Sequence, residues 1–253
     1  MSGRRRLLRH EGGAVYVEFL LVFLPVFLLF LAVVQLGFVY AARLVVQHSA
    51  NRGVRAAVVI IDDDPARYGG EPRGQLHLTG SHQPRFSGQA YFQGIGYAGS
   101  ADTLGGPRFL DIRGAAALPL LAVAPTPAAL GGPESVRSAI GSDRARVAGG
   151  SIYNQSAVAV VFPTAPGANT FRTRFGKDDL VTVRVTYLFH CSTPLVSRLM
   201  CKSAASAAGG LSADERGQLD LGYLSSLPNP RFLVVRGEAT LRNQGVGYRY
   251  ESE

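Results

Sequence analysis

A single glutamate stands at the edge of a stretch that is otherwise suited to lipid. Glu18 lies in "GGAVYVEFLLVFLPVFLLFLAVV", and from Phe19 to Ala42 there is no charged side chain and Gln35 is the only strongly polar one. Burying a carboxylate at the edge of such a run costs on the order of a few kcal/mol unless it meets a partner or lies near the interface. Two interpretations follow: Glu18 is a boundary charge that tolerates its position, or something in the membrane needs it.

Cys191 and Cys201 are the protein's two cysteines. In an oxidising compartment, an isolated pair so close in sequence is most simply a disulfide. Two unrelated buried thiols are the alternative. A zinc site is a weaker alternative, because neither cysteine belongs to a CxxC pair and only His190 is adjacent.

The remaining polar residues form no catalytic or metal-binding pattern. Of the five histidines, only His77 and His82 have a metal-ligand spacing, and the HExxH, GxSxG and CxxC motifs are absent. The "IDDDP" stretch lacks the alternating ligands of a calcium loop. The sequence therefore predicts no enzyme, no metal, no cofactor and no small-molecule substrate. A Ser–His–Asp triad assembled by the fold stays open as an alternative, although nothing points to one.

The net charge of +8 comes mostly from arginines scattered along the chain, and only "MSGRRRLLRH" is a dense basic block. Binding of nucleic acid would require a basic stripe with interleaved aromatic residues, and the sequence has none. We therefore expect no nucleic-acid partner. Residues 1–13 are instead expected to form a basic cytoplasmic leader in front of a membrane segment.

The apolar run predicts a transmembrane helix over residues 14–42. Roughly 24 residues at about 1.5 Å each give near 36 Å, against a bilayer core of about 30 Å. An ordinary secretory signal has a shorter apolar region, and a cleavage site near "FVYAA" is a minor alternative. The basic leader is harder to translocate than the long remainder, so the N-terminus is expected inside. Pro25 is expected to kink the helix.

The helical pattern continues beyond the membrane segment, over residues 43–61. One face is apolar and is formed by Val46, Ala50, Val54, Ala57, Val58 and Ile61. The other face carries Gln47, His48, Asn51, Arg52 and Arg55. The helix is expected to end at "DDDP", because the residue before Pro65 is pushed out of helical geometry. The apolar face must pack on something, most simply on the exported domain of the same chain.

The rest of the chain divides by composition into two parts. Residues 62–150 are rich in Gly, Pro, Ala and Ser, which predicts long loops with short strands or one short helix. Residues 151–253 contain the strand-like stretches "SAVAVVF", "DLVTVRVTYLF" and "RFLVVRGEATLR", which predict an antiparallel sheet with one face covered. Ser212 and Glu215 form a capping box, which predicts a short helix between the strands. The predicted fold class is α+β, with the long helix laid across a small antiparallel sheet.

The basic leader, Gly13, Glu18 five residues later and the long apolar helix together resemble a type IV prepilin. The stretch "GAVYVEFLLVFLPVFLLFLAVVQLGFVYAARLVVQHSANRGVRAAVV" resembles more closely the TadE-like pseudopilins of tight-adherence (Tad, Flp-type) pilus systems. "VTVRVTYLF...TPL" and "RGEATLRNQGVGYRY" resemble that family's C-terminal strands more loosely. The resemblance implies that a prepilin peptidase cuts after Gly13, that Ala14 becomes the N-terminus, and that the Glu18 carboxylate pairs with the free α-amino group of a neighbouring subunit.

The function that this resemblance implies is structural. We expect a membrane-anchored minor pseudopilin whose partners are the membrane, a prepilin peptidase and other pilins or Tad assembly subunits. Its expected location is the bacterial inner membrane, in a single pass, with the N-terminus cytoplasmic and the bulk of the chain periplasmic or extracellular. The alternative is a signal-anchored periplasmic enzyme or binding module whose helix is only a tether.

Overall fold

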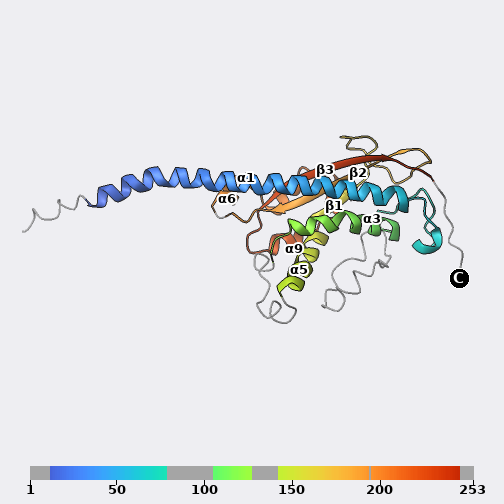
Figure 1. The fold of residues 1–253 in the computed structure, drawn as a ribbon, viewed down its shortest axis with the longest axis horizontal. Helices are drawn as coiled ribbons and strands as arrows, with labels where there is room; N and C mark the ends of the chain where they lie inside the picture. The colour runs from blue at the N-terminus through green and yellow to red at the C-terminus, as the bar shows by residue number, and fades with distance from the viewer. Residues whose placement is uncertain (1–11, 79–104, 127–141, 194, 246–253) are drawn as a thin grey trace, which may run out of the picture.

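The computed structural model of the protein describes residues 12–78, 105–126, 142–193 and 195–245. One helix, α1 (Gly12–Ile60), runs along the length of the molecule, and the other elements pack on its C-terminal part (Figure 1). The helix ends where the sequence predicts: Asp64, the residue before Pro65, is extended, and its side chain accepts a hydrogen bond from the backbone of Ala66. This bond caps the short 3-10 helix η1 (Pro65–Tyr68).

The three predicted strands form one antiparallel sheet in the order β1-β2-β3. They are β1 (Val158–Val161), β2 (Leu180–His190) and β3 (Phe232–Arg242). The first strand is shorter than predicted, because Ser156 and Ala157 complete the helix α5 (Ser142–Ala157) that leads into it. The prediction of an α+β fold, with a long helix on a small antiparallel sheet, is confirmed.

Helix α1 covers one face of the sheet. Gly237 of β3 lies so close to the helix that a Cβ atom there would come within 2.8 Å of the backbone oxygen of Val46. In β2, Val181, Val183 and Val185 are fully buried. Not every residue on this face is buried: Leu241, near the end of β3, is 40% exposed.

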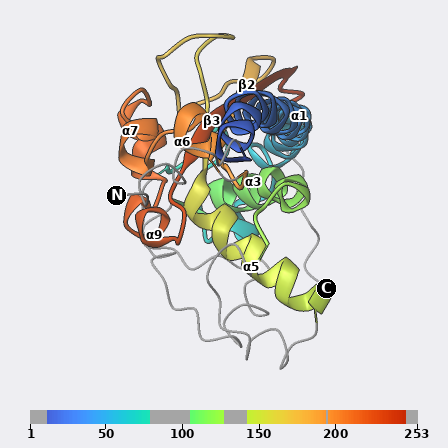
Figure 2. The same cartoon turned by 90° about the vertical axis from the view of Figure 1, so that its left-hand side faces the viewer.

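The opposite face of the sheet is also covered, which corrects the prediction that only one face is buried. Thr182, Arg184 and Thr186 are each at most 3% exposed. The reason is that each of them has a polar partner in the covering layer or on the neighbouring strand. The Thr186 hydroxyl donates to Glu215, and Arg184 is paired with Glu238. Figure 2 shows the two layers, with α1 and α3 on one side of the strands and α7 and α9 on the other.

The middle of the chain holds more helix than predicted. It contains α3 (Pro107–Ala117), the 3-10 helix η3 (Leu118–Ala122) and the start of α5. Helix α3 begins with Pro107 at a position where a missing N–H costs nothing, and it packs against α1. The predicted boundary at residue 151 falls inside α5. Residues 79–104 and 127–141 of the predicted loop-rich segment lie outside the described residues, as does His82.

Four short helices connect β2 to β3: α6 (Val196–Met200), α7 (Ala204–Ala208), α8 (Ala213–Gly217) and α9 (Leu221–Ser226). The predicted capping box is present at α8. The Ser212 side chain accepts from the backbone of Glu215, and the Glu215 side chain accepts from the backbone of Ser212. Two donors at the start of α8 are thereby satisfied.

Candidate assembly interface

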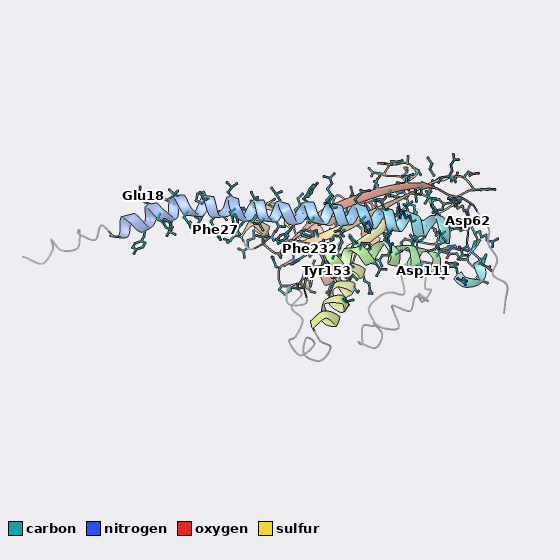
Figure 3. The ribbon with its side chains drawn as sticks, in the orientation of Figure 1. Glu18, Phe27, Asp62, Asp111, Tyr153 and Phe232 are labelled. Carbon is teal, nitrogen blue, oxygen red and sulfur yellow. A yellow bond between two sulfur atoms is a disulfide. The ribbon has the colours of Figure 1, made fainter. Side chains whose placement is uncertain are left out.

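The N-terminal half of α1 carries large apolar side chains that the rest of the described chain does not cover (Figure 3). Within the part of the chain that the structure describes, one helix is long and apolar enough to cross a membrane. An apolar surface of this extent requires lipid or other helices as its environment. The exposed side chains are those of Tyr16, Val17, Phe19, Leu20, Leu21, Val22, Phe23, Leu24, Val26, Phe27, Leu29, Phe30 and Val33.

Three phenylalanines form a ladder along one side of this segment. The rings of Phe19 and Phe23 have their centroids 5.3 Å apart, and those of Phe23 and Phe27 are 5.6 Å apart. The spacing of four residues places them on the same helix face. The three rings form one aromatic strip along the helix, which suits lateral packing against another helix.

Glu18 lies at the start of this segment, on the exposed surface of the helix and far from the sheet and the helices that cover it (Figure 3). It is the one acidic residue of α1. Among the described residues it has no ion-pair partner. A carboxylate in this position therefore depends on the interface, or on another molecule, for a partner.

Gly13 and Ala14, the predicted processing site, lie in the first turn of α1. Ala14 precedes Glu18 by four residues, so the two lie on the same side of the helix about one turn apart. The side-chain surroundings of Gly13 and Ala14 and residues 1–11 of the basic leader lie outside the described part of the chain. Pro25 lies inside α1 and the helix continues through it; the predicted kink stays a prediction.

The C-terminal half of α1 has the two faces that the sequence predicts. Five of the six predicted apolar residues are at most 1% exposed, and Val58 is partly buried. The five predicted polar residues, including His48, are exposed. The same helix is therefore uncovered in its first half and forms part of the protein core in its second half.

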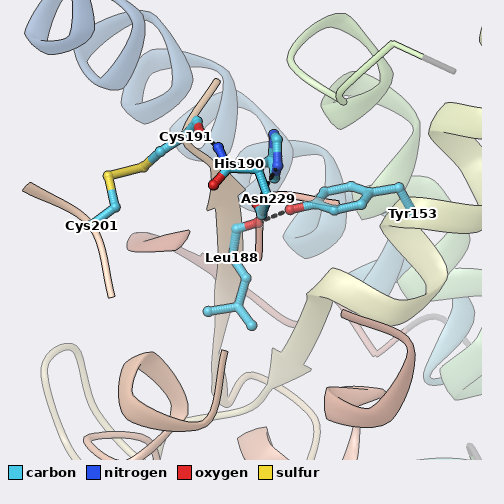
Figure 4. Close-up of a disulfide and its surroundings, with 6 residues drawn as sticks. All are labelled: Tyr153, Leu188, His190, Cys191, Cys201 and Asn229. Atoms are coloured by element: carbon cyan, nitrogen blue, oxygen red, sulfur yellow. Dashed lines mark hydrogen bonds between the residues drawn. A yellow bond between two sulfur atoms is a disulfide. The ribbon is translucent and has the colours of Figure 1, made fainter. Parts of the chain in front are cut away.

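Cys191 and Cys201 form the predicted disulfide, with their sulfur atoms 2.01 Å apart (Figure 4). The bond closes the segment that contains α6. The side chain of the adjacent His190 makes a hydrogen bond: its Nε2 atom lies 2.8 Å from the carbonyl oxygen of Asn229 and donates to it. Burial lowers the pKa of His190, although the bond to Asn229 opposes the shift. The imidazole is therefore a neutral structural donor.

The sequence predicts Glu215 only as a helix cap, and the structure shows a second role. Glu215 is 1% exposed. Besides Ser212, its carboxylate accepts from the Thr186 hydroxyl at 2.6 Å and from the Arg236 guanidinium at 3.1 Å. It therefore joins α8 to the polar face of the sheet. Burial by itself raises the pKa of Glu215, but the hydrogen bonds and Arg236 outweigh it, and the net effect lowers the pKa.

We expect Glu215→Gln to destabilise the protein by about 1–3 kcal/mol at neutral pH, because the amide leaves buried donors without an acceptor. A lowered folded-state pKa means that the carboxylate contributes stability above its ordinary pKa of 4.5, and that this contribution is lost as the pH falls through the folded-state value. The difference between wild type and variant should therefore shrink below pH 4.5. Urea denaturation at several pH values measures it. Asp214→Asn, at the exposed neighbour, is the control and should have little effect; equal effects of the two variants would contradict the assignment.

Two buried arginines of α3 also have roles that no sequence pattern predicts. Arg108 is fully buried and donates to the carbonyl oxygens of Ile60 and Asp63, so it caps the C-terminal end of α1. Arg113 donates to the carbonyl oxygens of Gln155 at 2.7 Å and Val158 at 2.8 Å, at the end of α5. Burial lowers the pKa of Arg113 to about 10. Both side chains satisfy carbonyl groups at or just beyond a helix end, so their role is structural.

Among the described residues, no group of three or more histidine, cysteine or acidic side chains could hold a metal ion. His77 pairs with Glu71, with its Nδ1 atom 2.8 Å from the carboxylate. Glu71 also accepts hydrogen bonds from the backbones of His77 and Arg108. This cluster ties the segment after α1 to α3, which gives it a structural purpose.

Residues 13–55 match a family model described as TadE-like protein. Comparison with curated proteins and with solved structures gave no match. The matched residues cover the exposed apolar half of α1 and most of its buried half. They confirm the family resemblance of the N-terminal helix, while the looser resemblance of the C-terminal strands stays a prediction.

Proposed function

The chain carries a TadE-like segment at its N-terminus, and from this premise we propose that it is a membrane-anchored minor pseudopilin of a Tad/Flp-type pilus or a related secretion apparatus. Its activity is lateral packing of the helix with other subunits, and the proposal assigns it no catalysis. The observation that carries the proposal is the position of the match. It begins at Gly13, directly before the predicted mature N-terminus Ala14, and it includes the uncovered apolar surface of the N-terminal half of α1.

In this proposal the partner of the Glu18 carboxylate is the α-amino group of Ala14 on a neighbouring subunit. A prepilin peptidase that cuts after Gly13 frees the α-amino group of Ala14, whose reference pKa is about 7.7–8.0. In the membrane this ammonium group and the Glu18 carboxylate are each costly alone and much less costly as a hydrogen-bonded pair. Two subunits that pack side by side can form this pair. The uncovered surface of the described helix, with its aromatic ladder, supports such packing.

The proposed orientation follows from charge. The arginines of the leader hold Gly13 at the cytoplasmic side of the bacterial inner membrane, within reach of the peptidase. The sheet and its covering helices then lie on the periplasmic side. The disulfide supports this placement, because disulfides persist in oxidising compartments.

The mature N-terminus tests the proposal. We expect N-terminal sequencing of membrane-extracted wild type to begin at Ala14. Gly13→Leu should leave the uncut precursor, because a bulky residue blocks close approach of the peptidase to the backbone. Glu18→Ala should be processed but fail in assembly, and Glu18→Asp should be intermediate, because its carboxylate reaches less far by one methylene.

Gly37→Leu is the matched control for Gly13→Leu. Gly37 lies in the same helix, and a Cβ atom added there would meet no atom within 4 Å. This variant should be processed normally. A wild-type protein that begins at Met1, or near Ala41 after ordinary signal cleavage, would rule out the pseudopilin proposal.

A further inference from the structure

The disulfide-closed segment between Cys191 and Cys201 exposes two leucines. Leu195 is 57% and Leu199 76% exposed. Leu195 directly precedes α6 and Leu199 lies within it, next to Arg198, which is exposed as well. The closed segment therefore presents a small apolar tip with an adjacent positive charge.

The position of this tip along α1 follows from the register of β3. Gly237 contacts the backbone of Val46, and near the other end of the strand Asn243 donates to Asp62 at 2.7 Å. Strand and helix thus run in the same direction. Phe232 precedes Gly237 by five strand residues, or about 17 Å at about 3.3 Å each.

Seventeen ångströms correspond to about 11 helical residues, so Phe232 lies level with about residue 35 of α1. Phe232 pairs with His190 across the sheet, and the backbone of the next residue, Cys191, donates to Arg231 at 2.9 Å. The disulfide segment therefore begins beside the middle of α1. Figure 1 shows α6 alongside the helix in this region, toward its N-terminal half.

The burial of α1 agrees with this position. From Tyr16 to Val34 no residue of the helix is buried, and Gln35, at 1% exposure, is the first that is. Other residues of this chain therefore cover the Gln35 side chain. Helix α6 is one of the elements that pack against α1. Both polar atoms of Gln35 lack a hydrogen-bond partner among the described residues. The exported domain thus covers the one strongly polar side chain of the apolar run.

The same level coincides with the outer edge of the predicted membrane core. A core of about 30 Å takes about 20 helical residues, so a core that begins at Phe19 ends near residue 38. Tyr40 is 66% exposed and Arg43 follows it, which is the pattern of residues at a membrane–water interface.

We infer that the disulfide-closed segment is a second membrane contact. Leu195 and Leu199 insert into the outer leaflet beside α1, and Arg198 lies at the level of the lipid phosphates. This inference rests on the proposed membrane anchoring of α1, because the apolar surface of the segment continues that of the helix. The contact holds the sheet against the bilayer and limits its rotation about α1.

Tryptophan reporters test the inference, because the protein contains no tryptophan. The full chain is reconstituted in vesicles of phosphatidylcholine and phosphatidylglycerol, with or without bromine on the acyl chains at shallow and deep positions. Three single variants are compared: Leu199→Trp in the segment, Phe27→Trp in the apolar half of α1, and Val59→Trp as a matched control. Val59 is 68% exposed and lies in the other half of the helix.

We expect brominated lipid to reduce the emission of Leu199→Trp and Phe27→Trp, and aqueous iodide to reduce that of Val59→Trp alone. If lipid quenches Phe27→Trp but not Leu199→Trp, the inference is overturned while the membrane anchoring stands. If neither brominated lipid nor iodide quenches the emission of Leu199→Trp, a second copy of the chain covers this residue. That result also overturns the inference. If lipid quenches neither variant, the proposed anchoring itself fails and the inference with it.

Discussion

Residues 62–253, expressed without α1, should remain soluble but lose cooperative unfolding, whereas residues 43–253 should unfold in one transition. Helix α1 and the residue after it contribute to the core the side chains of Val46, Ala50, Val54, Ala57 and Ile61, all at most 1% exposed. Burying each large one is worth about 1.5–3 kcal/mol. Their sum is comparable with the total stability of a domain, about 5–15 kcal/mol.

The shorter fragment also loses the acceptor at Ile60 for the buried Arg108 guanidinium, and leaving a buried charged group short of partners is costly. Denaturation followed by near-ultraviolet circular dichroism compares the two fragments, and binding of a hydrophobic dye reports the apolar patch uncovered on the sheet. If the two fragments unfold at the same denaturant concentration and equally sharply, α1 is not part of the core.

Gly237→Ala should destabilise the protein by about 1–3 kcal/mol, the usual cost of overpacking a core. The added Cβ atom would come within 2.9 Å of backbone atoms of both Val46 and Gln47. A backbone cannot move aside as the end of a side chain can. The strand and the helix must therefore separate, which loosens the contact on which the whole fold depends.

Gly210→Ala is the control for Gly237→Ala. Gly210 is exposed, and a Cβ atom there would meet nothing within 4 Å. Replacing glycine by alanine at such an open site is neutral or stabilises by about 0.4–1 kcal/mol, because the unfolded chain loses freedom. Thermal unfolding of the two variants should therefore shift in opposite directions or by clearly different amounts. Equal shifts of the unfolding temperature would show that the short distance between Gly237 and the α1 backbone does not determine the effect of the added Cβ atom.

Features that depend on neighbours in sequence were predicted well. The two halves of α1 and its end at Ile60 follow from hydrophobic periodicity and from Pro65, which act over one or two helical turns. The capping box of Ser212 and Glu215 spans three residues. The strands β2 and β3 follow from their alternation. The disulfide was predictable because the chain has two cysteines, so there is one way to pair them.

Features that depend on distant segments could not be predicted in this way. Alternation places Arg184 and Thr186 on a polar face of β2, but their burial depends on Glu238 and Glu215, which lie 54 and 29 residues away. Likewise the spacing of Arg108 and Arg113 gives no sign that they end buried on the carbonyl groups of α1 and α5. A charged residue is usually exposed, and only the fold supplies the partners that change this.

The sequence by itself thus determined which half of the helix suits lipid, which face of the other half is apolar, and where Gly13, Ala14 and Glu18 stand relative to that helix. Those properties are set by side-chain type and by the 3.6-residue repeat. Only the tertiary structure decided how far along α1 the sheet and its covering helices reach. The disulfide segment lies at the level of Gln35 because β2 pairs with β3 and because Gly237 of β3 packs closely against the backbone of α1. This level depends on contacts between residues almost 200 positions apart, which no local pattern encodes.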